Sequence, residues 1–288
     1  MRTYQRAIYH LPAVLEDEFA AELFAAGTLG CEARPAGTSL TLAAWFHDQP
    51  PAPSPVWIRL GVRLAGVEPV PEQDWLAEYR SGVQPFPLGH HFWIDPGEPD
   101  QPAASPPEGR WLLRLPARTA FGVGSHESTR LALELLEETD VAGLSVLDVG
   151  TGTGILAFGA LLLGAAKTLA FDLDPQALPV ARENARLNRD VLAGREPALF
   201  AGELSALAEP ARFDVLLVNV LPSEVESVLP DLASHLAPGG QWIFSGVLLE
   251  QEAELCRKLR AFHLYPNRTL QEGDWVGLRF AQRPGAAT

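Results

Sequence analysis

A glycine-rich loop between a predicted strand and a predicted helix constrains the fold of this chain more than any other feature. Residues 148–154 read DVGTGTG; they follow the apolar segment Leu144–Val149 and lead into the helical pattern Thr153–Gly164. Glycines at these positions let the backbone turn sharply and let a ligand touch it directly. The N-terminus of the following helix presents free amide groups at the same place. A strand, a glycine-rich turn and a helix in this order are typical of a nucleotide-binding α/β fold.

Strands and helices continue to alternate after this loop. The final two strands are joined by a short Glu-Gly-Asp turn, with no helix between them. The pattern predicts an α/β fold: a doubly wound, mostly parallel seven-stranded sheet that ends in an antiparallel hairpin. The other six expected strands cover residues 168–173, 197–200, 213–218, 241–246, 265–270 and 275–280, and the other expected helices cover residues 175–188, 223–236 and 249–262.

An acidic residue at the end of the second strand indicates which ligand the loop binds. Asp172 should lie beside the glycine loop, where a carboxylate can accept hydrogen bonds from both hydroxyls of a ribose. A mere cap of the strand end is the alternative role for Asp172. An adenosine ligand could be a dinucleotide, since residues 152–157 match G-x-G-x-x-A. However, Asp148 would repel a pyrophosphate, whereas S-adenosylmethionine is cationic near its reacting end. The loop and the terminal hairpin therefore favour S-adenosylmethionine.

The regions before this sheet predict a second, smaller domain and a connecting segment. Strands are expected at residues 3–11, 38–46 and 56–64, with a helix at 13–26, which gives a small α+β domain over residues 1–66. Residues 67–110 are expected to contain a linker helix, Glu72–Arg80, and a proline-rich exposed loop, Asp95–Gly109, that can be neither helix nor central strand. The larger domain then covers residues 111–288.

Composition excludes several classes of protein. The 288 residues include 22 basic and 36 acidic side chains, a net charge of −14. Residues 1–66 carry 5 basic and 6 acidic residues, and the rest carry 17 and 30, so the acidity lies in the larger domain. Such a surface repels nucleic acid and attracts basic partners. The longest apolar run, residues 155–166, is too short to span a membrane, and no signal peptide is apparent. We expect a cytoplasmic protein.

Neither cysteines nor histidines suggest a further cofactor. Two cysteines, Cys31 and Cys256, cannot build a disulfide framework. His90 and His91 have no cysteine or carboxylate partner at ligand spacing, so no metal site is expected.

Several segments, in order along the chain, resemble the ribosomal protein L11 methyltransferase family. The block Ala-Phe-Gly-x-Gly-x-His at residues 120–126, joined to Asn219-Val-Leu, is more specific than the glycine loop, which all class I methyltransferases share. The resemblance covers about residues 72–280. Its segments are 73–79 (QDWLAEY), 120–134 (AFGVGSHESTRLALE), 146–157 (VLDVGTGTGILA), 171–177 (FDLDPQA), 184–188 (NARLN), 218–221 (VNVL), 236–240 (LAPGG), 245–248 (SGVL) and 272–276 (EGDWV).

The resemblance implies a cofactor, a substrate and a set of site residues. The cofactor would be S-adenosylmethionine and the substrate an amine, either a lysine or the α-amine, of ribosomal protein L11, held by the small N-terminal domain. Asn219 would be the catalytic residue that faces the methyl group and the incoming amine. The implied cofactor contacts are Thr129 over the cofactor, Gly150 and Gly152 in the loop, Asp172 on the ribose, Asn219, a lid of Phe121 and Gly122, and Gly202-Glu203 near adenine.

Departures from the family pattern leave alternatives open. Val123, Ser125 and Pro222 stand where the family commonly has other residues. The substrate could be another protein or a small amine, or the chain could be an inactive cofactor-binding module that docks on a ribosomal protein. Asn219 could instead cap the helix that starts near Ser223. No general base is apparent, Trp111 and Trp275 are expected in the core, and His126 is expected to form hydrogen bonds at a helix N-terminus.

Overall fold

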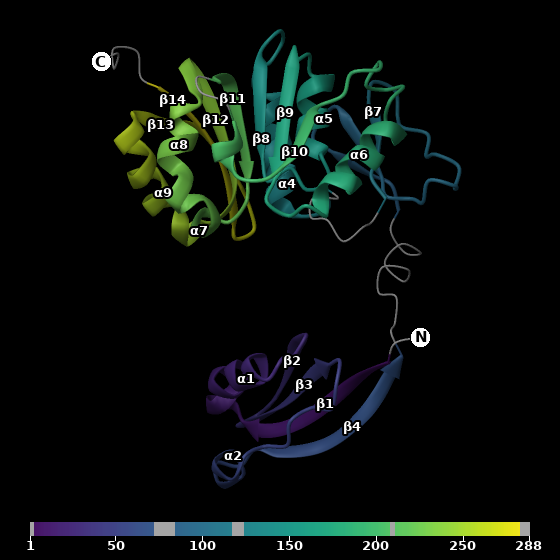
Figure 1. Ribbon diagram of the computed structural model, residues 1–288, viewed down its shortest axis with the longest axis vertical. Coiled ribbons are helices and arrows are strands. Elements are labelled where there is room, and N and C mark those ends of the chain that lie inside the picture. Colours follow the sequence, from purple (N-terminus) through teal and green to yellow (C-terminus); the bar gives the residue numbers. More distant parts are fainter. Residues whose placement is uncertain (1–2, 72–83, 117–123, 208–210, 283–288) are drawn as a thin grey trace. The chain divides into compact units, whose positions relative to one another are not determined.

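The computed structural model describes residues 3–71, 84–116, 124–207 and 211–282. The chain divides into two compact units, residues 1–75 and residues 76–288, each drawn in Figure 1.

The first unit is an antiparallel sheet of four strands in the order β2-β3-β1-β4. Aromatic contacts join the first helix to the sheet and the second helix to the first: the ring of Phe19 in α1 lies 5.1 Å from the ring of Tyr9 in β1 and 5.1 Å from the ring of Trp57 in α2. The core of the unit also includes Leu11, Leu40, Leu42 and Phe46. The elements are β1 (Thr3–Pro12), a 3-10 turn (Ala13–Leu15), α1 (Glu16–Ala25), β2 (Gly30–Ala36), β3 (Ser39–Phe46), α2 (Pro55–Arg59) and β4 (Arg63–Pro71).

Several expectations for this unit are corrected. The predicted strand at residues 56–64 is wrong: α2 begins there because Pro55 occupies its first turn, and Gly61, with φ +97°, turns the chain into β4. Strand β2 was not predicted, because it begins with glycine and carries Pro35. The predicted domain boundary at residue 66 falls inside β4. The predicted helix Glu72–Arg80 lies outside the described residues.

The second unit contains the seven-stranded sheet, and its topology confirms the predicted fold class. The strand order is β10-β9-β8-β11-β12-β14-β13. Strands β8 to β12 are parallel, and β14 runs antiparallel to both of its neighbours. The strands are β8 (Ser145–Val149), β9 (Lys167–Asp172), β10 (Ala198–Ala201), β11 (Phe213–Asn219), β12 (Leu236–Leu248), β13 (Leu264–Glu272) and β14 (Trp275–Gln282).

Helices cover both faces of this sheet (Figure 1). Neighbouring residues of β11 alternate between two apolar clusters: Leu217 packs in one and Leu216 and Val218 in the other, as expected for a sheet buried on both faces. No helix in the described part of the chain is long and apolar enough to cross a membrane. The helices are α4 (Glu127–Glu137), α5 (Ile155–Leu162), α6 (Ala177–Leu187), α7 (Pro222–Val225), α8 (Leu229–Ser234) and α9 (Glu252–Leu259), with 3-10 turns at Leu204–Ala206, Glu226–Val228, Leu249–Gln251 and Arg260–Phe262.

The segment predicted as a linker is, from residue 84 onward, part of the second unit. It forms a three-stranded sheet of β5 (Phe86–Leu88), β6 (Phe92–Asp95) and β7 (Trp111–Arg114). Side chains from this sheet, among them Phe92 and Leu113, are buried in the same apolar cluster as α4 and α5. Beyond Asp95, which ends β6, the proline-rich stretch forms neither helix nor strand, as predicted, but it connects β6 to β7 and is tied to the buried carboxylate of Asp95.

Candidate active site

A cavity of about 570 Å³ opens where strands β8, β9 and β11 end at the same edge of the sheet. The carboxyl edge of an open parallel sheet is the usual place for ligands in α/β folds. Gly150 and Gly152 follow β8, Asp172 ends β9, and Asn219 ends β11. The remaining residues that line the cavity are His126, Ser128, Asp174, Ala177, Val220, Leu221, Glu224, Gly246 and Trp275.

The glycine loop is shaped by a backbone conformation that only glycine adopts readily. Gly150, Gly152 and Gly154 have φ values of +70°, +53° and +88°. The backbone N–H groups of Gly150 and Thr151 both donate to the carbonyl of Phe171, at 3.0 and 2.9 Å. A Cβ at position 150 would lie 2.7 Å from Val220 Cγ1. A side chain at residue 150 would therefore displace the wall of the cavity.

Asp172 is fixed to the glycine loop by hydrogen bonds to both of its carboxylate oxygens. Oδ2 accepts the N–H of Gly152 at 2.9 Å, and Oδ1 accepts the N–H of Asp174 at 3.0 Å. The second bond is the strand-end cap considered from the sequence. The carboxylate also lines the cavity. Because each carboxylate oxygen has a second lone pair, Asp172 can accept further hydrogen bonds from a ligand there.

Asp148 lies beneath the loop and does not line the cavity. Its carboxylate is fully buried, and Thr151 Oγ1 donates to its Oδ2 at 2.7 Å. Burial raises the pKa of Asp148 to about 7, against the opposing effect of the hydrogen bonds from Thr151 and the backbone of Ala157. The nearby charge of Asp172 raises the pKa further. Asp148 therefore titrates near neutral pH.

Asn219 lines the cavity and carries a buried hydrogen-bond acceptor. Its side-chain Nδ2 donates to Thr129 Oγ1 at 3.2 Å. Its Oδ1 is buried and has no hydrogen-bond partner among the residues that the structure describes. An unpaired buried acceptor is costly, so a partner supplied by a ligand is favoured. The alternative role as a helix cap is wrong, because α7 begins at Pro222 after Leu221 and has no side-chain cap.

The other predicted site residues fall into three groups. Thr129 is completely buried and does not line the cavity; its contact with the site is the hydrogen bond to Asn219. Phe121 and Gly122 lie outside the described residues. Gly202 and Glu203 do not line the cavity; the N–H of Gly202 instead donates to the carbonyl of Asp172 at 3.0 Å.

His126 and Trp275 both line the cavity, and only the position of His126 was predicted correctly from the sequence. His126 is the N-cap of α4, where its Nδ1 accepts the N–H of Ser128 at 3.2 Å, as expected. Trp275 was expected in the core but lines the cavity, with its ring edge-on to His126 at 4.8 Å. Hydropathy does not separate a tryptophan beside a cavity from one in a core, so the sequence carried no signal for Trp275.

The residues after Asn219 were also missed, although a signal for them existed. Val220, Leu221 and Glu224 follow the end of β11 directly and line the cavity. Gly246 brings β12 against this segment: a Cβ there would lie 2.8 Å from the carbonyl oxygen of Val220. The carboxyl end of a strand in this fold predicts that the following loop contacts the ligand.

The charge of the cavity favours cationic ligands. Asp172, Asp174 and Glu224 line it, and its described lining contains no lysine or arginine. Within the described ranges, no group of three or more histidine, cysteine, aspartate or glutamate side chains is placed to hold a metal ion. The cavity is suited to a positively charged ligand that carries a ribose. The protein also offers a hydrogen-bond acceptor there, on Asn219.

Comparisons with known proteins agree on one family. The family described as ribosomal protein L11 methyltransferase (PrmA) matches residues 54–283. A ribosomal protein L11 methyltransferase of Pseudomonas aeruginosa is 39% identical over 217 residues, which cover 75% of this chain and 70% of the relative. One of Symbiobacterium thermophilum is 34% identical over 226 residues, 77% and 71% of the two chains. The crystal structure of a ribosomal protein L11 methylase from Lactobacillus delbrueckii subsp. bulgaricus superposes with a TM-score of 0.62 at 32% identity, over 70% of this chain and all of that one.

Proposed function

Because this chain belongs to the ribosomal protein L11 methyltransferase family, and so is an S-adenosylmethionine-dependent methyltransferase, we propose that it methylates amines of ribosomal protein L11. We assign the reaction to the cavity at the ends of β8, β9 and β11. One observation carries the assignment: Asn219 lines this cavity, and its Oδ1 is buried without a partner among the described residues. An amine N–H is the complementary group.

The residues around the cavity fit the cofactor. Asp172 would accept hydrogen bonds from the ribose hydroxyls with its free lone pairs, and the backbone at Gly150 and Gly152 would lie against the methionine part. The acidic lining suits the positive charges of the ammonium and sulfonium groups. When bound, S-adenosylmethionine supplies a methyl group on a sulfonium, which is open to attack by a neutral amine. Phe121 and Gly122 stay predicted contacts.

The protein must lower the free-energy cost of deprotonating the substrate amine and of aligning it with the methyl group. A lysine with a pKa near 10.4 is neutral in roughly 0.04% of molecules at pH 7, whereas an α-amine near 7.8 is about 15% neutral. Deprotonating the lysine therefore costs about 4.6 kcal/mol. Burial of the amine against Val220, Leu221 and Trp275 would disfavour its cationic form.

Asn219 is the residue that we assign to alignment. Its Oδ1 would accept one N–H of the amine, which directs the nitrogen lone pair toward the methyl group. Thr129 holds Nδ2 of the same amide, which leaves Oδ1 as the group that can accept from the substrate amine. This orientation is set before the substrate arrives, and a preset polar contact of this kind contributes more to rate than to binding.

We assign recognition of the ribosomal protein to the first unit. Residues 1–75 carry 5 basic and 9 acidic residues, and the rest of the chain has a net charge of −10. Both units are acidic and would attract a basic protein. The sheet of the first unit would then make the specific contacts. Docking on one unit and chemistry on the other would let several amines of the same substrate reach one cavity.

The experiment that tests this function uses labelled cofactor. The full chain is incubated with S-adenosylmethionine labelled in the methyl group and with purified ribosomal protein L11, free lysine or a bacterial extract from which L11 has been removed. We expect label on lysine ε-amines or the α-amine of L11, located by mass spectrometry. Label that appears only on free lysine or on other proteins would contradict L11 as the substrate, and no transfer to any of them would indicate an inactive binding module.

A further inference from the structure

Two buried asparagines, one in α6 and one that caps its C-terminus, take no part in lining the cavity, yet they connect the glycine loop to β7. Asn184 and Asn188 begin and end a segment that resembles the family, and both are almost completely buried. We propose that Asn184 and Asn188 are positioning residues, which hold the glycine loop in the shape that binds the cofactor. This inference rests on the cofactor site proposed above and adds two residues to it.

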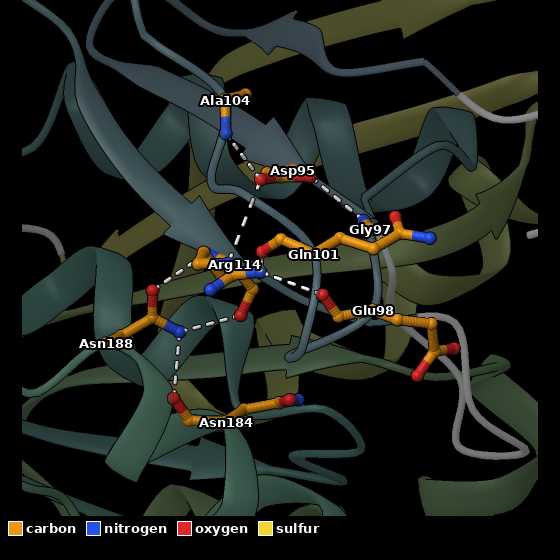
Figure 2. A network of polar contacts seen from close by, with 8 residues as sticks. All are labelled: Asp95, Gly97, Glu98, Gln101, Ala104, Arg114, Asn184 and Asn188. Atoms are coloured by element: carbon orange, nitrogen blue, oxygen red, sulfur yellow. Dashed lines mark hydrogen bonds and ion pairs between the residues drawn. The ribbon is translucent and has the colours of Figure 1, made fainter.

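The side chain of Asn188 pairs with the backbone of β7 as a neighbouring strand would. Its Oδ1 accepts the N–H of Arg114 at 2.7 Å, and its Nδ2 donates to the carbonyl of the same residue at 2.8 Å (Figure 2). Arg114 ends β7, which is an edge strand paired only with β6 among the described strands. Buried backbone groups at such an edge need partners, and one side-chain amide supplies both.

Asn188 also supports Asn184. Nδ2 of Asn188 makes a second hydrogen bond, to the carbonyl of Asn184, at 2.8 Å. The N–H of Asn188 donates to the same carbonyl at 3.0 Å. With these contacts both hydrogens of the Asn188 side-chain amide are used. The end of α6 is therefore tied to β7 at a fixed position.

Asn184 passes this support to the glycine loop. Its Nδ2 donates to the carbonyl of Thr153 at 3.0 Å. Thr153 is completely buried and lies between Gly152, which lines the cavity, and Gly154. Both glycines have positive φ, and glycine has more conformational freedom than any other residue. A hydrogen bond from outside the loop compensates for that freedom.

At the other end, Arg114 holds the proline-rich connection between β6 and β7. Its guanidinium donates to the carbonyls of Glu98 and Gln101, at 2.9 and 3.0 Å. Asp95 accepts the N–H groups of Gly97 and Ala104, each at 2.9 Å. These contacts continue directly into the Asn188 contacts (Figure 2). The connection that was predicted as a linker is thus joined to the glycine loop through Arg114, Asn188 and Asn184.

The test compares two variants of the full-length protein with a matched control. Asn184→Leu and Asn188→Leu keep the branched arrangement of four side-chain heavy atoms, add no charge and remove the amide. Thr139→Val removes a buried hydroxyl that donates to the carbonyl of Leu135 at 2.7 Å, in the same unit but away from the glycine loop. Affinity for S-adenosylhomocysteine is measured by calorimetry below the melting temperature of every variant, together with kcat and KM for S-adenosylmethionine.

We expect Asn184→Leu to weaken S-adenosylhomocysteine binding at least tenfold, because the carbonyl of Thr153 loses its donor. Asn188→Leu should weaken binding at least threefold, since it acts through Asn184, and Thr139→Val should stay within twofold. KM for the cofactor should rise while kcat changes less than threefold.

A purely structural role would give a different result. If both asparagine variants melt at a lower temperature, as Thr139→Val does, but bind S-adenosylhomocysteine as the wild type does, the inference is overturned. If Asn184→Leu does not fold, Asn188→Leu decides the question by the same threefold criterion. A wild-type protein that does not bind S-adenosylhomocysteine would instead contradict the proposed function.

Discussion

Replacing Asn219 with alanine separates alignment of the substrate from every other role of this residue. The variant removes the acceptor at the cavity and leaves Gly150, Gly152 and Asp172 in place. Loss of one positioned polar contact in an active site lowers the rate about 10²–10³-fold. We therefore expect kcat for methyl transfer to fall at least 100-fold in single-turnover assays, while the affinity for S-adenosylhomocysteine changes less than threefold.

The structure predicts an unusual effect on stability in the same variant. Asn219→Ala removes the hydrogen bond to Thr129, which contributes about 0.5–1.5 kcal/mol. It also removes a buried oxygen without a partner among the described residues, whose burial costs about 1–3 kcal/mol. The middle of the second range lies above the middle of the first. Thermal melting should therefore show a variant that is as stable as the wild type or more stable.

Thr129→Val is the matched control for this reasoning. It keeps the volume at a fully buried position but removes the oxygen that accepts from Asn219 Nδ2. The acceptor at residue 219 remains but is no longer held, so kcat should fall about tenfold, less than in Asn219→Ala. Normal single-turnover rates in Asn219→Ala, whatever its stability, would refute the role in alignment.

Three further predictions concern the cofactor, the first unit and a buried acid. Asp172→Ala would remove the two charge-assisted hydrogen bonds that we propose to the ribose, each worth about 1.5–3 kcal/mol; calorimetry should show S-adenosylhomocysteine bound at least tenfold more weakly, and an unchanged affinity would exclude Asp172 from the site. A chain that starts after residue 75 should still bind S-adenosylhomocysteine but lose methylation of intact L11; a normal rate on L11 would disprove docking by the first unit. Because burial raises the pKa of Asp148 to about 7, its contribution to stability is present below pH 4 and is lost as pH rises toward 7. Asp148→Asn, compared with the wild type by denaturant unfolding at several pH values, should gain up to about 4 kcal/mol in relative stability between pH 4 and 7, and a constant difference would contradict the raised pKa.

The parallel sheet and the residues at its carboxyl edge could be predicted from local sequence. Gly150, Gly152, Asp172 and Asn219 stand at the ends of β8, β9 and β11, and all four line the cavity. Their positions follow from topology, because parallel strands that end at one edge bring their last residues together. The turn at the glycines could also be predicted, since positive φ is costly for other residues.

The errors arose where tertiary contacts decide the structure. Residues 67–110 were predicted as a linker because of the prolines in Asp95–Gly109, yet the carboxylate of Asp95 and the guanidinium of Arg114 satisfy backbone groups of that proline-rich stretch. The segment 56–64 is apolar enough for a strand, but Pro55 and Gly61 divide it into a helix and the start of a strand. Thr129 stays a predicted cofactor contact, but its hydrogen bond to Asn219 and the position of Ser128 at the cavity could not be read from the sequence. Contacts between residues distant in sequence leave no local pattern.

A crystal structure of the full chain with S-adenosylhomocysteine and a lysine-containing peptide of L11 would test the central claim most directly. The measurement is the distance from the substrate nitrogen to Asn219 Oδ1. We predict about 2.7–3.2 Å, the range of a hydrogen bond, with Thr129 Oγ1 still bound to Nδ2 of the same side chain. A substrate nitrogen that lies against the cofactor sulfur while Asn219 Oδ1 contacts only water or the cofactor would contradict the claim.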